Sequence, residues 1–257
     1  MITKPIAFGG GLQSRLLRLG QAALRQVFPP QCISCGARVD SEFALCGPCW
    51  RETHFAMGLV CDGCGTPLPG QDEGRPEHCD DCLAAPRPWT RGRSALVYRD
   101  NGRRLVLALK HGDRLDLARP MADWMLRAAA PILSPGLMVA PVPLHRWRLF
   151  RRRYNQSAHL SSRLARLAGL DHCPDLLLRR HATCSQEGRS RADRFENVDG
   201  AIIPHPRRAD QLAGRQILLV DDVMTSGATL AAATEACLMA GAAEVRVLVL
   251  ARVAKDG

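Results

Sequence analysis

Cysteine pairs near the N-terminus constrain this chain more than any other feature of its sequence. Of eleven cysteines, eight form four CxxC pairs: Cys32/Cys35, Cys46/Cys49, Cys61/Cys64 and Cys79/Cys82. A CxxC turn directs two thiolates at one tetrahedral ion, and two such turns complete a closed four-thiolate zinc site. A segment this short and this poor in apolar residues needs metal to hold its fold. The spacing therefore predicts two structural zinc ions.

The order of the cysteines predicts how they pair. Sequential pairing places the first four on one zinc and the last four on another, as two consecutive zinc ribbons within residues 31–88. A cross-braced arrangement satisfies the same spacing and stays open. Redox-active CxxC is disfavoured because four copies occur without a βαβ context. Disulfides are disfavoured because this is not the pattern of a small secreted protein.

Length, composition and charge exclude several classes of protein. The chain has 257 residues, 46% apolar and 23% charged, which is typical of a globular protein with one sizeable core and a smaller module. No apolar run approaches the roughly 18 residues that span a bilayer. No signal-peptide cleavage site is convincing, so we expect a cytoplasmic protein. The net charge of +10 is almost wholly arginine, which suits phosphate recognition, although an arginine-rich genome produces the same bias.

Helices and strands are expected to alternate along most of the chain. Leucines at helical spacing predict an amphipathic helix at 12–27, within an N-terminal segment 1–30 that packs against the rest of the protein. After a linker near residue 88, the predicted strands are 94–98, 137–143, 175–180, 215–220 and 244–253. The predicted helices are 102–112, 114–130, 155–169 and 228–241. This alternation predicts an α/β fold with a parallel sheet covered on both faces by helices, and with ligands at the carboxyl ends of its strands.

The stretch QILLVDDVMTSGATL, residues 216–230, predicts where a ligand binds. Ile217–Val220 form a central strand, with Asp221 and Asp222 at its carboxyl end. The loop 224–229 then bends around a glycine into a helix, so its N–H groups and hydroxyls form a cradle for a phosphate dianion. The carboxylates can accept hydrogen bonds from sugar hydroxyls or contact hydrated Mg2+. A ligand with all three features is a ribose 5-phosphate derivative.

This stretch resembles the phosphoribosyl pyrophosphate (PRPP) motif of type I phosphoribosyltransferases. From Pro29 onward the chain also resembles the ComF family, which is associated with DNA uptake in natural competence. The shared segments are the ribbons, LALKHGD, PVPLHRWRLFRRRYNQ and CSQEGRSRADRFENV. One departure is Arg153, where the family usually has glycine; Asn155 and Gln156 remain in place. The resemblance implies that residues 89–257 form a phosphoribosyltransferase-like domain that uses PRPP with Mg2+, its acceptor not established.

The resemblance also implies roles for individual residues. The residues expected to bind PRPP are Lys110, His145, Arg146, Asp221, Asp222, Thr225, Ser226, Gly227, Ala228 and Thr229. Those expected to act in catalysis are Arg152, Arg189, Arg194, Asp221 and Asp222. The arginines would neutralise the departing pyrophosphate, and catalysis would consist of positioning and charge neutralisation more than acid–base chemistry. The segment 186–197 would be a flap that closes over PRPP, with a solvated loop as the alternative.

Two functions from different classes follow. The first is a phosphoribosyltransferase that uses Mg2+–PRPP as its donor. The second is a nucleic-acid-binding or scaffold protein of the DNA-uptake machinery, in which ribbons and arginines engage single-stranded DNA and the PRPP site acts as a sensor. The aromatic content of 5% is low for base-stacking platforms and weakens the second. Neither the acceptor nor the oligomeric state follows from the sequence.

Overall fold

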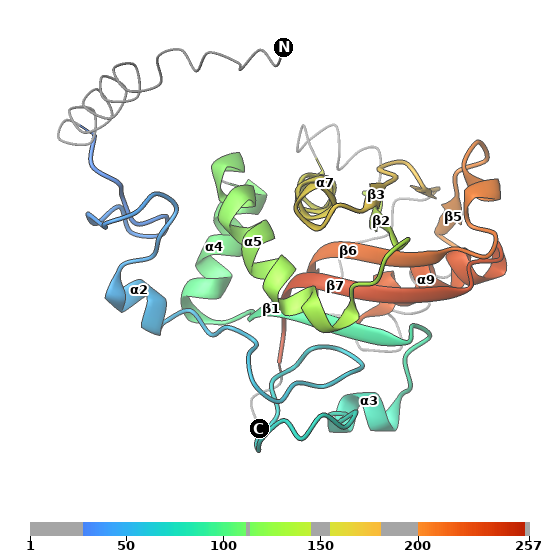
Figure 1. The fold of residues 1–257 in the computed structure, drawn as a ribbon, viewed down its shortest axis with the longest axis horizontal. Coiled ribbons are helices and arrows are strands. Elements are labelled where there is room, and N and C mark those ends of the chain that lie inside the picture. The colour runs from blue at the N-terminus through green and yellow to red at the C-terminus, as the bar shows by residue number, and fades with distance from the viewer. Residues whose placement is uncertain (1–27, 112–113, 145–154, 181–199, 255–257) are drawn as a thin grey trace, which may run out of the picture. The chain divides into compact units, whose positions relative to one another are not determined.

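The fold comes from a computed structural model that describes residues 28–111, 114–144, 155–180 and 200–254 (Figure 1). The chain divides into two compact units, Met1–Trp50 and Arg51–Gly257. The first unit contains the first four cysteines of the ribbons, and helix α2 (Gly47–Arg51) runs across the division. The helix predicted at 12–27 lies outside the described residues. The predicted domain boundaries at residues 30 and 88 stay predictions, because a compact unit is not the same thing as an independently folding domain.

A parallel sheet forms the centre of the second unit. Among the described residues its strands are β1 (Arg91–Val97), β2 (Met138–Pro141), β3 (Asp171–His172), β6 (Gln216–Met224) and β7 (Glu244–Arg252). Their order is β1-β7-β6-β2-β3, and every pair is parallel (Figure 1). The predicted central strand is confirmed as β6, and Ile217–Val220 are fully buried within it. An uninterrupted apolar run of this kind is typical of a parallel strand covered on both faces.

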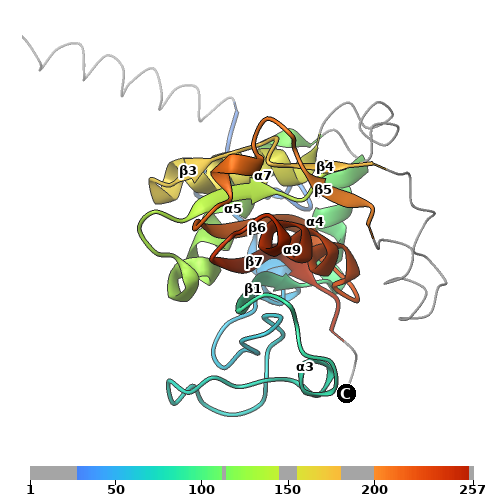
Figure 2. The same cartoon turned by 90° about the vertical axis from the view of Figure 1, so that its right-hand side faces the viewer.

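Helices cover both faces of this sheet. They are α4 (Asp100–His111), α5 (Ala118–Ala129), α7 (Gln156–Ala168) and α9 (Ala228–Met239). Figures 1 and 2 show α5 and α7 on one face and α9 on the other. Ile217 and Leu219 pack in one core cluster with Ala233 and Cys237 of α9, whereas successive strand residues point to opposite faces. The predicted α/β class is thus confirmed. Among the described residues, no helix is long and apolar enough to cross a membrane.

Several elements differ from the sequence prediction. Strand β6 continues to Met224 and therefore includes the two acidic residues, because its ladder with β7 extends that far. The strand predicted at 175–180 is β4 (Leu177–Arg179), which pairs antiparallel with β5 (Ile202–Pro204) in a separate ribbon. Pairing with a returning segment takes β4 out of the parallel sheet. Short 3-10 turns, η1 (Leu115–Leu117), η2 (Ala130–Ile132) and η3 (Ala209–Gln211), flank α5 and precede β6.

The second zinc ribbon, with helix α3 (Asp80–Ala84), packs along the β1 edge of the sheet (Figures 1 and 2). The Gly92 amide donates to the carbonyl of Asp62 at 2.6 Å, and Ser94 Oγ donates to the carbonyl of Gly65 at 2.7 Å. Gly65 has φ +72°, and a Cβ there would meet Ser94 N at 2.3 Å, so only glycine allows this approach. Ribbon cysteines are buried in the core cluster that includes strands and α9. Ribbon and sheet therefore share one core.

Candidate functional site

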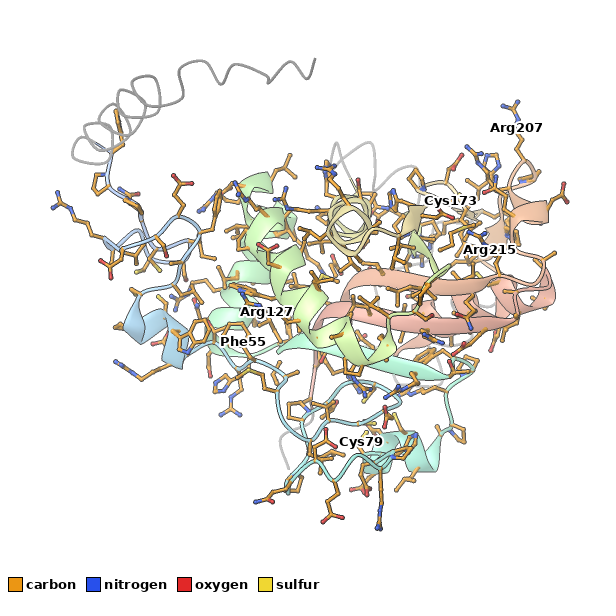
Figure 3. The ribbon with its side chains drawn as sticks, in the orientation of Figure 1. Phe55, Cys79, Arg127, Cys173, Arg207 and Arg215 are labelled. Atoms are coloured by element: carbon orange, nitrogen blue, oxygen red, sulfur yellow. The ribbon has the colours of Figure 1, made fainter. Side chains whose placement is uncertain are left out.

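The ribbon cysteines converge into two clusters. The clusters are Cys32, Cys35, Cys46, Cys49 and Cys61, Cys64, Cys79, Cys82, each with all four sulfurs within 4.8 Å of one another. Figure 3 labels Cys79 of the second cluster. Sulfurs lie 3.5 Å apart between Cys35 and Cys46, and a tetrahedral zinc with Zn–S bonds of about 2.3 Å separates its thiolates by about 3.8 Å. Sequential pairing is confirmed, and both clusters fit closed, structural zinc sites.

Two carboxylates occupy the carboxyl-terminal part of β6. Asp221 Oδ1 accepts hydrogen bonds from Ser157 Oγ and from the backbone N–H of Asp222, both at 2.8 Å. Asp222 Oδ1 lies 3.1 Å from Lys110 Nζ, and their side chains are only 14% and 18% exposed. Each acid thus has its own partner, which is how two like charges can sit side by side at one strand end.

The sequence Asn155-Gln156-Ser157 places these partners. Asn155 caps α7 through a 3.0 Å bond from the Ser157 amide, and its Nδ2 donates to the carbonyl of Val142 just after β2. Gln156, which is 1% exposed, donates through Nε2 to the carbonyl of Lys110. The cap residue is among the best helix starters, and it directs the Ser157 hydroxyl at the acid pair. The start of α7 therefore joins β2, α4 and β6.

One carboxyl of the acid pair holds its proton more tightly than an isolated aspartate does. Burial raises the pKa of the Asp221 carboxyl to about 7, with the negative charge of Asp222 as the second cause. The hydrogen bonds from Ser157 and the Asp222 amide, and the charge of Lys110, oppose this rise. A cation or a hydroxyl donor brought to the pair would favour its fully ionised form.

We expect Asp221→Asn to stabilise the protein, increasingly so with rising pH. The raised pKa means that the folded state binds more protons than the unfolded state between about pH 4 and 7, so wild-type stability falls as pH rises through that window. Asparagine cannot ionise but still accepts from Ser157. The gain in unfolding free energy should grow from pH 4 to 7 and level off above, below a ceiling of about 4 kcal/mol. Chemical denaturation across pH measures it, with Glu235→Gln as control; a gain that is flat or shrinks with pH would contradict it.

A short loop rich in hydroxyl groups follows the strand that carries the acids. Thr225 is exposed, Ser226 and Thr229 are partly buried, and Gly227 takes φ +85° immediately before α9 begins at Ala228. Ser226 Oγ accepts from the Ala228 amide at 3.4 Å. A helix N-terminus with preceding turn amides is a site for anions. The loop lies near the acids because it begins where β6, the strand that carries them, ends.

The structure brings some predicted site residues together and leaves others undescribed. Lys110, Asp221 and Asp222 converge, and the loop 225–229 continues from them. His145, Arg146, Arg152, Arg189 and Arg194 lie outside the described residues, as does the predicted flap 186–197.

Sequence reasoning missed three residues that support this site. Ser157 bonds to Asp221, while Arg87 and Arg252 donate to carbonyls of the loop after β6. The available signal for Ser157 was a hydroxyl next to a helix cap. For Arg252 it was an arginine at the end of an apolar strand. Arg87, in a proline-rich linker, gave none.

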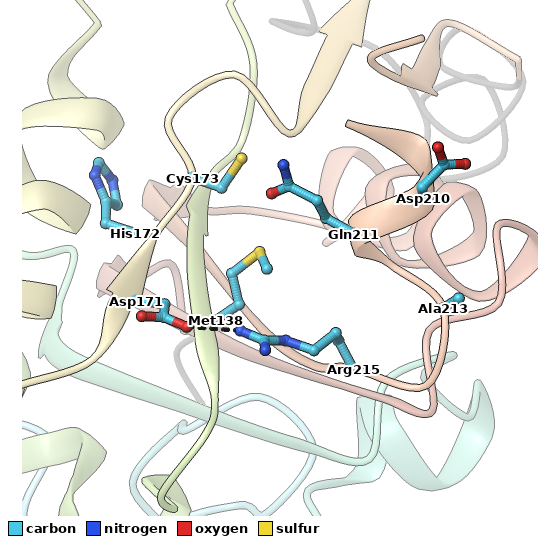
Figure 4. Close-up of a pocket in the computed structure, with 8 residues that line it drawn as sticks. All are labelled: Met138, Asp171, His172, Cys173, Asp210, Gln211, Ala213 and Arg215. Carbon is cyan, nitrogen blue, oxygen red and sulfur yellow. Dashed lines mark hydrogen bonds and ion pairs between the residues drawn. The ribbon is translucent and has the colours of Figure 1, made fainter. Parts of the chain in front are cut away.

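A separate cavity of about 470 Å3 lies at the other end of the strands (Figure 4). It is lined by Met138, Asp171, His172, Cys173, Asp210, Gln211, Ala213 and Arg215. Asp171 and Arg215 form an ion pair of 2.7 Å across it. Met138 and Asp171 begin β2 and β3, so the cavity is at the amino ends of the strands, where parallel sheets do not normally bind ligands. The acid pair and loop are the better candidate.

Sequence comparisons agree with both parts of this architecture. The profile of the double zinc ribbon domain family matches residues 23–83, and that of the phosphoribosyl transferase domain family matches residues 178–257. The chain is 32% identical over 218 residues to DNA utilization protein YhgH of Salmonella typhimurium, covering 82% of this chain and 92% of that protein. It is 27% identical over 228 residues to Competence protein F of Haemophilus influenzae, covering 86% and 96%.

Fold, cysteine clusters and strand–loop site thus define a phosphoribosyl-transferase-type α/β protein with a double zinc ribbon. Within that class the chain belongs to the ComF family, together with DNA utilization protein YhgH and Competence protein F.

Solved structures give weaker likenesses. Glutamine PRPP amidotransferase from B. subtilis is 18% identical with a TM-score of 0.38, covering 56% of this chain and 30% of that one. Hypoxanthine-guanine phosphoribosyl transferase of L. donovani is 17% identical with a TM-score of 0.29, covering 58% and 71%. This chain therefore corresponds to less than a third of the amidotransferase. The strand order and the family profiles carry the fold assignment.

Proposed function

We propose that this protein is a phosphoribosyltransferase that takes Mg2+–PRPP as its donor. The observation that carries the proposal is the pair Asp221 and Asp222, held by Ser157 and Lys110 shortly before a loop whose turn amides and helix N-terminus suit an anion. A phosphoribosyl transferase domain profile matches the same segment. The acids can bind the two ribose hydroxyls, and the loop amides can bind the phosphate. Both lie at the same end of β6, as the two parts of a ribose 5-phosphate require.

Each part of the site has one task in this proposal. The amides and hydroxyls of Thr225, Ser226 and Thr229 bind the 5-phosphate, with the N-terminus of α9 adding its dipole. Asp221 and Asp222 accept hydrogen bonds from the ribose hydroxyls and so fix the sugar. Carboxylate oxygens also suit Mg2+, which keeps most of its waters and binds through one or two carboxylates together with substrate phosphates.

Catalysis then follows from placement and charge. As the bond between the anomeric carbon and pyrophosphate breaks, positive charge develops on the ribose and negative charge on the leaving group. The acid pair lies on the side of the sugar, where preorganised negative charge stabilises the developing cation. Bound Mg2+ would supply neutralisation of the leaving pyrophosphate. Lys110 holds the Asp222 side chain in place through their ion pair. His145, Arg146, Arg152, Arg189 and Arg194 are proposed for pyrophosphate from the family resemblance alone.

Titration calorimetry with Mg2+–PRPP and the zinc-loaded full chain tests this proposal. We expect one site per chain, and binding that releases protons near pH 7, because ligand favours the ionised form of Asp221. Screening nucleobases, amines and peptides for PRPP-dependent pyrophosphate release then identifies the acceptor class. Absence of PRPP binding would overturn the proposal. Binding without release for any acceptor would favour a sensor over an enzyme.

The names of the relatives favour a second, compatible role in the handling of DNA. One relative is called a DNA utilization protein and another a competence protein, and this chain carries a net charge of +10. Arginine contacts to phosphates would make binding of single-stranded DNA weaken steeply with added salt. In that role PRPP would act as a signal: its binding to this protein would control the part that the protein plays in DNA uptake.

A further inference from the structure

The loop after β6 is held from behind by two arginines. Arg87 Nη1 donates to the carbonyl of Ser226 at 2.7 Å. Arg252 Nη1 donates to the carbonyl of Thr225 at 2.6 Å and to that of Met224 at 3.3 Å. Three successive loop carbonyls are therefore bound by guanidinium groups.

Both arginines also contact the second zinc ribbon. Arg87 Nε donates to Cys82 Sγ at 3.4 Å, and Cys82 is one of the four ligands of the second cluster. Arg252, which is 4% exposed, places Nη2 3.8 Å from Asp81 Oδ2 in α3. Each guanidinium thus bridges the ribbon to the loop.

Close packing reinforces this connection. Trp89 is 4% exposed, and its Nε1 donates at 2.6 Å to the carbonyl of Gly63, inside a CxxC turn. The guanidinium of Arg87 lies 5.7 Å from the centre of the Trp89 ring. A Cβ on Gly227 would come within 3.0 Å of Arg87 Nη1 and 3.2 Å of Trp89 Cη2. The loop rests directly on these two side chains.

The hydrogen bonds from the two arginines to the loop carbonyls also set the direction of the loop N–H groups, which are the donors that an anion needs. In a trans peptide the N–H points opposite to the C=O. Fixing the carbonyls of Met224, Thr225 and Ser226 toward the arginines therefore turns the next three amides to the other side. A guanidinium on the carbonyl also polarises the peptide and strengthens its N–H as a donor. The arginines can thus prepare an anion site without touching the anion.

We propose that Arg87 and Arg252 are positioning residues that hold the loop Met224–Gly227 in its anion-binding conformation and make it depend on the second zinc site. A zinc ion bound by the second cluster would hold Cys82 Sγ in place, and Arg87 Nε donates to that sulfur at 3.4 Å. The proposal rests on the proposed function only for the identity of the anion, a 5-phosphate.

Coupling between two sites is reciprocal, which gives a direct test. If zinc orders the loop, saturating Mg2+–PRPP must tighten the binding of zinc by the second ribbon. At equilibrium with a colorimetric chelator, we expect one of the two zinc ions to need a several-fold higher chelator concentration for its removal when PRPP is present. In Arg87→Ala, at PRPP concentrations that still saturate the site, this protection should disappear.

A matched control separates the loop contact from general ribbon packing. Arg91 also ties the second ribbon to the sheet, but it donates to Asp62 and Pro131. Arg91→Ala should therefore keep the zinc protection and the PRPP affinity, whereas Arg87→Ala should weaken affinity about tenfold, the loss expected for one charged hydrogen bond. Protection that persists in Arg87→Ala, or that is absent from wild type despite PRPP binding, would overturn the proposal.

Amide hydrogen exchange of residues 224–230 keeps this test apart from the proposed function. We expect exchange of these amides to quicken about tenfold in Arg87→Ala and to stay unchanged in Arg91→Ala, without PRPP in the sample. If wild type fails to bind PRPP, the proposed function fails, but the exchange comparison still decides on the arginines. Unchanged loop exchange in Arg87→Ala and in Arg252→Lys would reject the positioning role.

Discussion

Replacing both acids of β6, Asp221→Asn with Asp222→Asn, should abolish Mg2+–PRPP binding in calorimetry. The neutral amides cannot attract Mg2+, and they accept hydrogen bonds from hydroxyls more weakly than carboxylates do. Two charge-assisted interactions lost together correspond to at least a hundredfold in affinity, at about 1.5–3 kcal/mol each. This is the largest functional effect that we expect from any substitution in the described residues.

The fold should survive this change. The substitution Asp221→Asn removes a buried charge beside Asp222, whereas Asp222→Asn leaves Lys110 with a neutral acceptor in place of its ion pair at 3.1 Å. These effects have opposite sign, so the melting temperature should change little. Glu235→Gln, which alters an exposed acid on α9, is the control and should bind PRPP like wild type. Retained affinity in the double variant would remove the acids from the site.

The second large effect is on stability, and it should differ between the two ribbons. Cys64 is 0% exposed and packs in the main core cluster, so Cys64→Ser should destabilise the whole second unit. Loss of a structural zinc site and of its packing is worth on the order of 5 kcal/mol, which lowers the melting temperature by about 10 °C or more for a unit of this size.

Cys35→Ser is the matched variant in the first ribbon. Cys35 is exposed and belongs to the other compact unit, so the main unfolding transition should stay near its wild-type temperature. Metal analysis should return two zinc ions for wild type and one for each variant. Equal losses of melting temperature in both variants would contradict the asymmetry, and one zinc in wild type would contradict the eight-ligand assignment.

The outline of the fold could be read from local patterns. The apolar runs at Ile217–Val220 and Val247–Ala251 became parts of neighbouring parallel strands, because uninterrupted apolar residues can be buried only inside a covered sheet. Helix α9 began where the glycine loop ended. The patterns did not reveal β3 or β5, which have two and three residues and owe their structure to pairing partners rather than to their own composition.

Some residues of the candidate site could likewise be predicted from local patterns, and others could not. Asp221, Asp222 and the loop 225–229 were visible because they are contiguous in sequence. Ser157 was not, since its hydroxyl reaches Asp221 across 64 residues of sequence. Lys110 was predicted to bind PRPP from the family resemblance, and only the structure shows its ion pair with Asp222.

Residue types at short spacing are enough to predict the chemical groups of the protein: two four-thiolate clusters, and an acid pair followed by a loop suited to an anion. These groups can be predicted because residues that are close in sequence stay close in space, however the rest of the chain folds. The folded chain alone shows that the second ribbon shares the core of the sheet and that Arg87 reaches Ser226, 139 residues away. The packing of β1, β7 and the ribbon brings the Arg87 guanidinium to the Ser226 carbonyl, and no local sequence pattern predicts that packing.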